Sequence, residues 1–217
     1  MKIGMLGTGP VGINIATKLV KQGHQVRMGS RDPENPEAAK WARRNGKRAS
    51  HGTFSEAAKF GDIIFNCTNG AHSIEALRKA GERNLRGKVL IDLANPLKFS
   101  KKGEMTLFIG NTDSLGEKIQ RTFPSAKVVK TLNTVNMRLH TNPSLLPGEH
   151  SIFMSGNDKQ AKAKVARILK GFGWKSIIDL GGIKSARGQE ALLLFWWHLN
   201  KRFPNEPFNY RIVRRRG

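Results

Sequence analysis

A glycine-rich turn near the start of the chain limits its fold more than any other feature. The segment Gly7-Thr8-Gly9-Pro10-Val11-Gly12 has the pattern G-x-G-x-x-G. It follows the short apolar segment 2–6 and opens the segment 11–20, where apolar residues recur at helical spacing. A strand that passes into a helix through such a turn is typical of the first unit of a parallel α/β fold.

Each glycine of this turn has a predicted steric role. Gly7 permits the tight turn, Gly9 lets a pyrophosphate approach the backbone, and Gly12 lets the helix pack closely on the strand. Pro10 suits the first helical turn, where the N–H that proline lacks would have no partner. The free N–H groups and the positive end of the helix dipole predict a dinucleotide site. Its expected contacts are Gly7, Thr8, Gly9, Pro10, Val11 and Gly12.

Short apolar strands alternate with helical segments along the rest of the chain. We expect strands at 2–6, 25–28, 62–66, 88–93, 127–130, 151–154 and 176–180, and an added edge strand at 208–213. We expect helices at 11–22, 36–46, 53–59, from 73 onward, and at 113–121, 158–171 and 186–201. The order predicts an α/β fold of the Rossmann type, with a doubly wound, mostly parallel sheet. Residues 1–217 should form a single domain, in which the segment from about 135 to 217 extends the same sheet.

The end of the second predicted strand indicates which dinucleotide is preferred. NAD-binding versions of this fold carry an acidic residue there, which accepts hydrogen bonds from the adenosine ribose. This chain has Ser30 and Arg31 instead, a hydroxyl and a guanidinium suited to a 2′-phosphate. Asp32 precedes Pro33 and fits a turn. The sequence therefore predicts NADP(H) as the cofactor.

The formal net charge of +22 allows two interpretations. A positive surface attracts phosphates and nucleic acids, but the basic residues are spread along the whole chain, which favours generally solvated faces. Nucleic acid stays open as a partner, although no binding motif accompanies the charge. We expect no membrane segment and no signal peptide. Cys67 is the only cysteine, so a multi-cysteine metal site is excluded, and we expect a cytoplasmic protein with no metal.

The chain resembles the NADP-dependent deazaflavin-coenzyme oxidoreductase family, and the resemblance extends from the first strand to the C-terminal segment. The segments that carry it, besides the glycine turn, are Gly29-Ser30-Arg31-Asp32-Pro33, Ile91-Asp92-Leu93-Ala94-Asn95-Pro96-Leu97, Thr131-Leu132-Asn133-Thr134, Ile178-Asp179-Leu180-Gly181, Ala186-Arg187-Gly188 and Phe208-Asn209-Tyr210-Arg211-Ile212-Val213-Arg214. The reductase domains of STEAP-type metalloreductases and the pyrroline-carboxylate reductases are more distantly similar, through the N-terminal half.

The resemblance implies that the nicotinamide lies where the loops after the third, fourth and fifth predicted strands meet. Thr68 and Asn95 would then line the nicotinamide site. Asn133 would face the hydride acceptor, and His72 is a further candidate for the acceptor pocket. At the Asn133 loop the family pattern would have histidine, so a deazaflavin, a flavin and a small carbonyl or imine compound all stay open as acceptors.

Hydride transfer requires alignment of two rings rather than a protein nucleophile, and the sequence indicates no catalytic triad. We therefore expect an oxidoreductase without an assigned catalytic residue. The alternative is a redox sensor or regulatory protein that binds NADP(H) without turnover. The apolar run 192–197, with two adjacent tryptophans, indicates either a homodimer interface or a pocket for a flat ring, and we favour the dimer.

Overall fold

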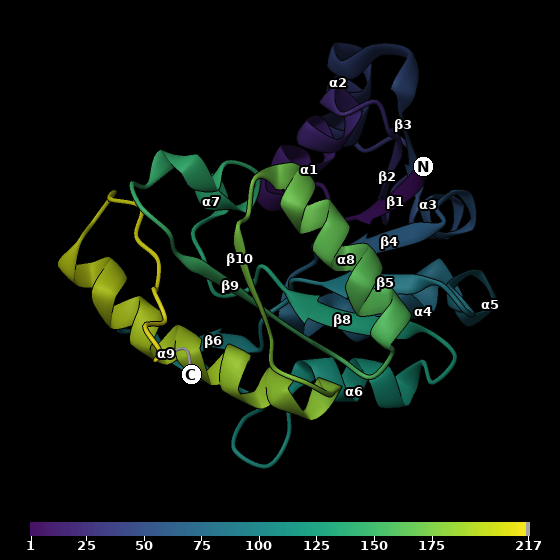
Figure 1. Ribbon diagram of the computed structural model, residues 1–217. Coiled ribbons are helices and arrows are strands. Elements are labelled where there is room, and N and C mark those ends of the chain that lie inside the picture. Colours follow the sequence, from purple (N-terminus) through teal and green to yellow (C-terminus); the bar gives the residue numbers. More distant parts are fainter. Residues whose placement is uncertain (216–217) are drawn as a thin grey trace.

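The computed structural model describes residues 1–215, so Arg216 and Gly217 of the predicted domain lie outside the described residues. Eight strands from these residues form one sheet in the order β10-β9-β8-β5-β4-β1-β2-β3 (Figure 1). The strands are β1 Lys2–Leu6, β2 Gln25–Ser30, β3 Ala49–Thr53, β4 Ile63–Asn66, β5 Val89–Asp92, β8 Lys127–Thr131, β9 Ser151–Gly156 and β10 Ser176–Asp179. All neighbours are parallel except β8 and β9. The predicted Rossmann-type sheet is confirmed.

Helices cover both faces of this sheet. The helices are α1 Pro10–Lys21, α2 Pro36–Asn45, α3 Phe54–Phe60, α4 Ser73–Ala80, α5 Glu82–Leu85, α6 Leu115–Thr122, α7 Met137–His140, α8 Lys159–Phe172 and α9 Ala186–Arg202. Apolar residues of α1, α2, α7 and α8 share one buried cluster with the strands. Those of α3, α4, α5, α6 and the start of α9 share the other. Burial on both faces explains why the central strands are apolar throughout.

The structure differs from the sequence predictions at the start of α6 and at β3. The helix expected to begin at Asp113 is capped by Ser114, whose Oγ accepts a hydrogen bond from the Glu117 N–H at 3.1 Å. Asp113 instead pairs with Arg121. The edge strand β3 was not predicted, because its sequence Ala-Ser-His-Gly-Thr has no apolar run.

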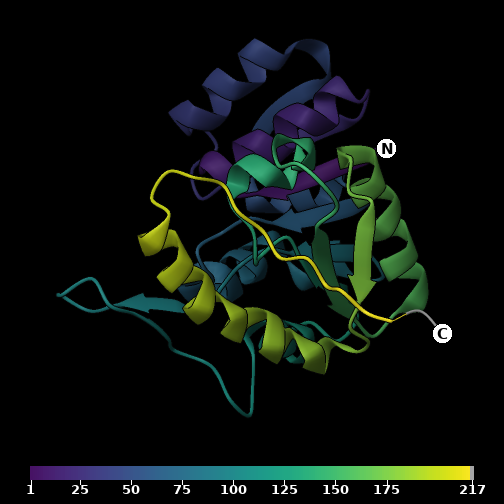
Figure 2. The ribbon, with the colours of Figure 1, turned by 60° about the vertical axis from the view of Figure 1, so that its left-hand side comes forward.

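The segment 208–213, predicted as an edge strand, is not one. It crosses the start of β9 with a single backbone hydrogen bond from that strand, from the Ser151 N–H to the Tyr210 carbonyl at 2.8 Å. Side chains hold it instead, including Asn209, whose Nδ2 donates to the Ser151 carbonyl at 3.0 Å. Figure 2 shows this yellow tail running back past α9, and a hairpin of β6 Leu97–Phe99 and β7 Met105–Leu107 that projects from the body.

His140 at the end of α7 is buried beside the Val135 carbonyl, which lies 3.3 Å from its Nε2. Burial lowers the pKa of His140 to about 4, despite opposing hydrogen bonds. In the unfolded chain this pKa is near 6.5, so between the two values the unfolded state binds more protons. The free energy of unfolding therefore decreases as the pH falls from 6.5 toward 4, by up to about 3 kcal/mol from His140.

Urea unfolding of wild type and His140→Gln at several pH values between about 7 and 4 checks this. The free energy of unfolding of the variant should fall less steeply with decreasing pH. Parallel profiles for the two proteins would contradict the assignment.

Candidate functional site

The glycine turn between β1 and α1 has the geometry that the motif predicts. Gly7 has a φ of 114°, and a Cβ there would lie 2.7 Å from the Cys67 carbonyl oxygen. A Cβ at Gly12 would lie 2.6 Å from the carbonyl oxygen of Gly7. At Gly9 a Cβ would meet nothing within 4 Å. The outer glycines thus allow close backbone packing, whereas the middle glycine faces open space.

The first turn of α1 is open to a ligand. Gly9 is the N-cap, Pro10 is the first helical residue, and no side chain among residues 1–215 caps this end. Gly9 and Pro10 are exposed, Thr8 and Val11 are half-buried, and Gly12 is buried. The helix dipole and the first amide groups therefore point at an open cradle beside β1, which fits a dinucleotide pyrophosphate.

The loop after β2 presents Arg31 to solvent. The Ser30 side chain is buried, and its Oγ accepts from the Asp32 N–H at 3.1 Å and donates to the Asp32 carbonyl. The Asp32 carboxylate accepts from the Glu34 N–H at 2.9 Å, so it caps the turn as expected. Ser30 thus shapes the loop that carries Arg31, and its hydroxyl already has two backbone partners.

Arg31 lines a pocket of about 210 Å³ together with residues from the loop after β4 and from α4. The pocket is lined by Arg31, Phe54, Thr68, Asn69, His72, Glu75, Ala76 and Lys79. Lys79 holds the pKa of Glu75 below its usual range, with smaller contributions from His72 and Arg31, so three basic side chains gather here. The structure therefore brings His72 together with Arg31. Lys79 was missed, although it lies one helical turn after Glu75.

The residues expected at the nicotinamide lie in the loops that follow β4, β5 and β8. Asn95 and Asn133 bind each other reciprocally: Asn95 Nδ2 donates to the Asn133 carbonyl, and Asn133 Nδ2 donates to Asn95 Oδ1, both at 3.0 Å. Thr68 Oγ1 donates to Asn66 Oδ1 at 2.6 Å. Asn133 is buried, while Thr68 and Asn95 are half-buried. Asn95 and Thr68 are therefore the more accessible of the three to a ligand.

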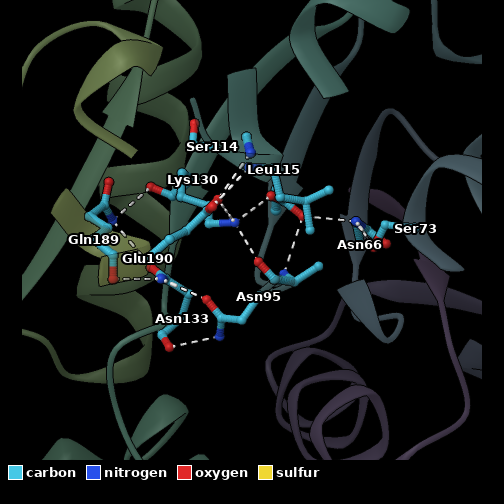
Figure 3. A network of polar contacts seen from close by, with 12 residues as sticks. Asn66, Ser73, Asn95, Ser114, Leu115, Lys130, Asn133, Gln189 and Glu190 are labelled. Atoms are coloured by element: carbon cyan, nitrogen blue, oxygen red, sulfur yellow. Dashed lines mark hydrogen bonds and ion pairs between the residues drawn. The ribbon is translucent and has the colours of Figure 1, made fainter. Parts of the chain in front are cut away.

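Asn133 is held by α9 as well as by Asn95. Its Nδ2 donates to the Gln189 carbonyl at 3.2 Å, and its Oδ1 accepts from Gln189 Nε2 at 3.3 Å (Figure 3). Gln189 Oε1 also accepts a hydrogen bond from Ser155. Gln189 was not predicted to have a role. It ties the loop after β8 and strand β9 to the C-terminal helix.

A second buried group next to Gln189 was also missed. Lys130 Nζ lies 2.8 Å from Asp92 Oδ2 and 2.7 Å from Glu190 Oε1, and all three side chains are almost fully buried (Figure 3). We call Asp92, Lys130 and Glu190 the buried triad. Asp92 Oδ1 accepts from Asn66 Nδ2 at 2.8 Å, so the triad is linked to the residue that holds Thr68.

The tryptophans of α9 pack within the described part of the chain. Trp196 lies 5.5 Å from Phe208 and Phe195 lies 6.2 Å from Tyr210, measured between ring centroids. Trp197 packs edge-on against Phe99 of the projecting hairpin at 5.5 Å. The indole nitrogens of Trp196 and Trp197 are buried without a hydrogen-bond partner among residues 1–215. The tail and the hairpin thus contact the aromatic side chains of the apolar run 192–197, but Leu194 and Phe195 stay exposed.

Cys67 has the environment of a packing residue. Its Sγ lies 3.4 Å from Met5 Sδ, and burial raises the pKa of the thiol well above its usual range. Among the described residues no group of three or more His, Cys, Asp or Glu side chains could hold a metal ion. A search of the same residues finds no helix with the length and apolarity needed to cross a membrane.

Comparison with known proteins defines the class. Residues 2–96 match the family model described as "NADP oxidoreductase coenzyme F420-dependent", and the protein is an NADP-dependent oxidoreductase. A crystal structure of a protein from Arthrobacter sp. FB24, whose name assigns it provisionally as an F420-dependent NADP reductase, is 47% identical over 99% of this chain and 100% of that one, with a TM-score of 0.94. The chain belongs to the F420-dependent NADP oxidoreductase family. The resemblance inferred from the sequence is confirmed.

Two further relatives differ in length. The F420-dependent NADP reductase of Methanocaldococcus jannaschii is 27% identical over 98% of both chains. The metalloreductase STEAP3 of Rattus norvegicus is 28% identical over 89% of this chain, but the chain spans only 36% of that protein. The first relative therefore matches the whole arrangement described above, and the second matches it as one part of a longer protein.

Proposed function

We propose that the protein transfers a hydride between NADP(H) and a deazaflavin acceptor of the F420 type. The observation that carries the proposal is the open cradle at the first turn of α1, with the basic pocket of Arg31, His72 and Lys79 nearby. The cradle suits the pyrophosphate, and the basic pocket suits the 2′-phosphate that distinguishes NADP from NAD.

In this proposal the protein binds and orients the cofactor and does not itself take part in the reaction as a nucleophile. The nicotinamide supplies the hydride chemistry when it is bound. The N–H groups of Gly9, Val11 and Gly12 hold the pyrophosphate, Arg31 pairs with the 2′-phosphate, and Ser30 fixes the loop that carries Arg31. Thr68 and Asn95 line the groove that positions the ring. Asn133 keeps the Asn95 side chain in place, and His72 belongs to the phosphate pocket.

The proposed hydride acceptor is a deazaflavin. A deazaflavin is favoured over a flavin or a small imine because relatives that match the chain almost end to end are named F420-dependent NADP reductases. The aromatic side chains of α9 and the tail, at the rim where β9 begins, would suit a flat ring system. We also propose that each chain is a single NADP-binding domain of a cytoplasmic protein. We propose that two chains form a homodimer, since large apolar side chains such as Phe99 and Phe195 are exposed.

Arg31→Ala tests the phosphate pocket. Loss of a charged hydrogen bond should weaken NADPH binding about tenfold or more, whereas NADH binding should stay nearly constant. Titration of nucleotide fluorescence gives both dissociation constants. Arg167→Ala, which removes an exposed arginine from α8, is the matched control and should change neither value.

Equal losses of NADPH and NADH affinity in Arg31→Ala would overturn the assignment of Arg31. Turnover separates the acceptors: NADPH oxidation with a deazaflavin, at a rate well above those with flavins and cyclic imines, is the expected result. Nucleotide binding without turnover on any of these would contradict the proposed reaction.

A further inference from the structure

The buried triad contains two carboxylates and one ammonium in a site closed to water. The exposed fraction is 0% for Asp92 and Lys130 and 1% for Glu190. Burial would lower the pKa of Lys130, but attraction by Asp92 and Glu190 outweighs it and raises that pKa, so the lysine stays charged. If both carboxylates are also ionised, the triad has one unbalanced negative charge.

Hydrogen bonds from the backbone support ionisation of both carboxylates. Glu190 accepts from the Leu115 and Gly116 N–H groups at the start of α6, at 2.8 and 3.0 Å. Asp92 Oδ1 accepts from the Ala94 N–H at 3.2 Å, besides the contact with Asn66. Donors aimed at a buried carboxylate favour its charged form. The dipole of α6 offsets part of the Glu190 charge but does not cancel it.

The same contacts place this charge next to the proposed nicotinamide groove. Ala94, which directly precedes Asn95, is held at both backbone atoms: its N–H by Asp92 and its carbonyl by Lys130 Nζ. Asn66 connects Asp92 to Thr68. The triad therefore lies directly behind the two residues proposed to line the groove.

The charge of the nicotinamide ring changes in the reaction. Transfer of one hydrogen nucleus with two electrons turns the neutral dihydropyridine of NADPH into a pyridinium with a charge of +1. The acceptor gains the electron pair and takes up a proton from solvent. A fixed charge near the ring therefore acts differently on the two forms of the cofactor.

We infer that the buried triad favours oxidised over reduced nicotinamide, because its unbalanced negative charge stabilises the pyridinium. This inference rests on the proposed function. In this inference Glu190, on the C-terminal helix, helps to set the redox equilibrium of the bound cofactor. Bound NADPH is then a stronger hydride donor than it would be in the same site without the Glu190 charge.

Glu190→Gln tests the inference, because it keeps the shape of the side chain and removes its charge. The ratio of the dissociation constants of NADP+ and NADPH should rise about fivefold, the change expected for a unit charge about 10 Å away at an effective dielectric constant of about 35, between the values for a protein surface and for water. For a two-electron couple this equals a potential about 20 mV higher. Isothermal titration with each nucleotide gives the ratio.

Glu117→Gln is the matched control. Glu117 pairs with Arg187 at 2.7 Å and also joins α6 to α9, but this pair is partly exposed and has no contact with the triad. The ratio in this variant should stay within about twofold of wild type. If Glu190→Gln does not fold, Asp92→Asn removes the other carboxylate and should shift the ratio in the same direction.

The outcomes separate this inference from the proposed function. If the wild-type protein binds neither nucleotide, the proposed function fails. If it binds both and Glu190→Gln leaves the ratio unchanged, only the inference is wrong. A similar rise in Glu117→Gln would also overturn it, because the effect would then be one of general surface charge.

Discussion

Gly9→Val is expected to abolish NADPH binding while the protein stays folded. A Cβ at position 9 meets no protein atom within 4 Å, and the backbone of Gly9 has a negative φ of −75°, so the backbone accepts a side chain here and the Cβ of valine enters open space. The same open space is the proposed position of the pyrophosphate. The valine side chain would fill it and hold the ligand away from the amides of α1.

The expected loss is at least about 100-fold in NADPH affinity, or about 2.7 kcal/mol. Calorimetric titration and a thermal unfolding curve on the same sample measure the two effects separately. Gly188→Val is the matched control, because a Cβ at that exposed position of α9 also meets nothing within 4 Å. Normal NADPH affinity in Gly9→Val would mean that the dinucleotide does not lie across this turn.

The largest expected effect on stability is that of Lys130→Met. Removal of the ammonium leaves Asp92 and Glu190 buried side by side without their common partner, which typically costs about 3–5 kcal/mol. Urea unfolding measures this directly. Arg121→Met breaks the exposed pair with Asp113 and should cost less than about 1 kcal/mol.

The effect of Lys130 also has a defined pH dependence. Because its pKa is raised in the folded state, its stabilisation is fully present below the unfolded value of 10.5 and is lost as the pH rises through the higher folded value. If Lys130→Met lowers the free energy of unfolding as little as Arg121→Met does, the carboxylates of Asp92 and Glu190 must become protonated or hydrated when the ammonium is removed.

The parts of the fold that depend on local sequence were predictable. The glycine turn, β1, α1 and the loop with Ser30 and Arg31 are each specified by residues close together in the chain, and the short apolar strands follow from burial on both faces. The weak edge strand β3 was missed because small and polar residues leave no pattern there. The tail was misread because alternating apolar residues predict a strand even where aromatic side chains provide the contacts.

The polar contacts behind the groove could not be found in this way. Lys130 and Asp92 are 38 residues apart, and Leu115 and Glu190 are 75 apart. In sequence, Glu190 resembles a solvated residue on a helix, and Lys130 resembles one of many surface lysines. The pairing of β5 with β8 places Lys130 beside Asp92, and the crossing of α9 over the sheet adds Glu190 to this buried group. The position of His72 beside Arg31 could not be predicted for a similar reason, because Arg31 belongs to a different loop, and its predicted place in the acceptor pocket stays a prediction.

The reversed direction of β9 has an evolutionary consequence. Because β9 runs antiparallel to β8, it starts at the carboxyl end of the parallel strands, where the tail binds its first residue, Ser151. The C-terminal part of the chain thereby contributes to the same rim as the nucleotide loops, although it follows them in the sequence. Mutations after about residue 135 can thus alter the C-terminal side of this rim while the glycine turn and the Arg31 loop stay unchanged.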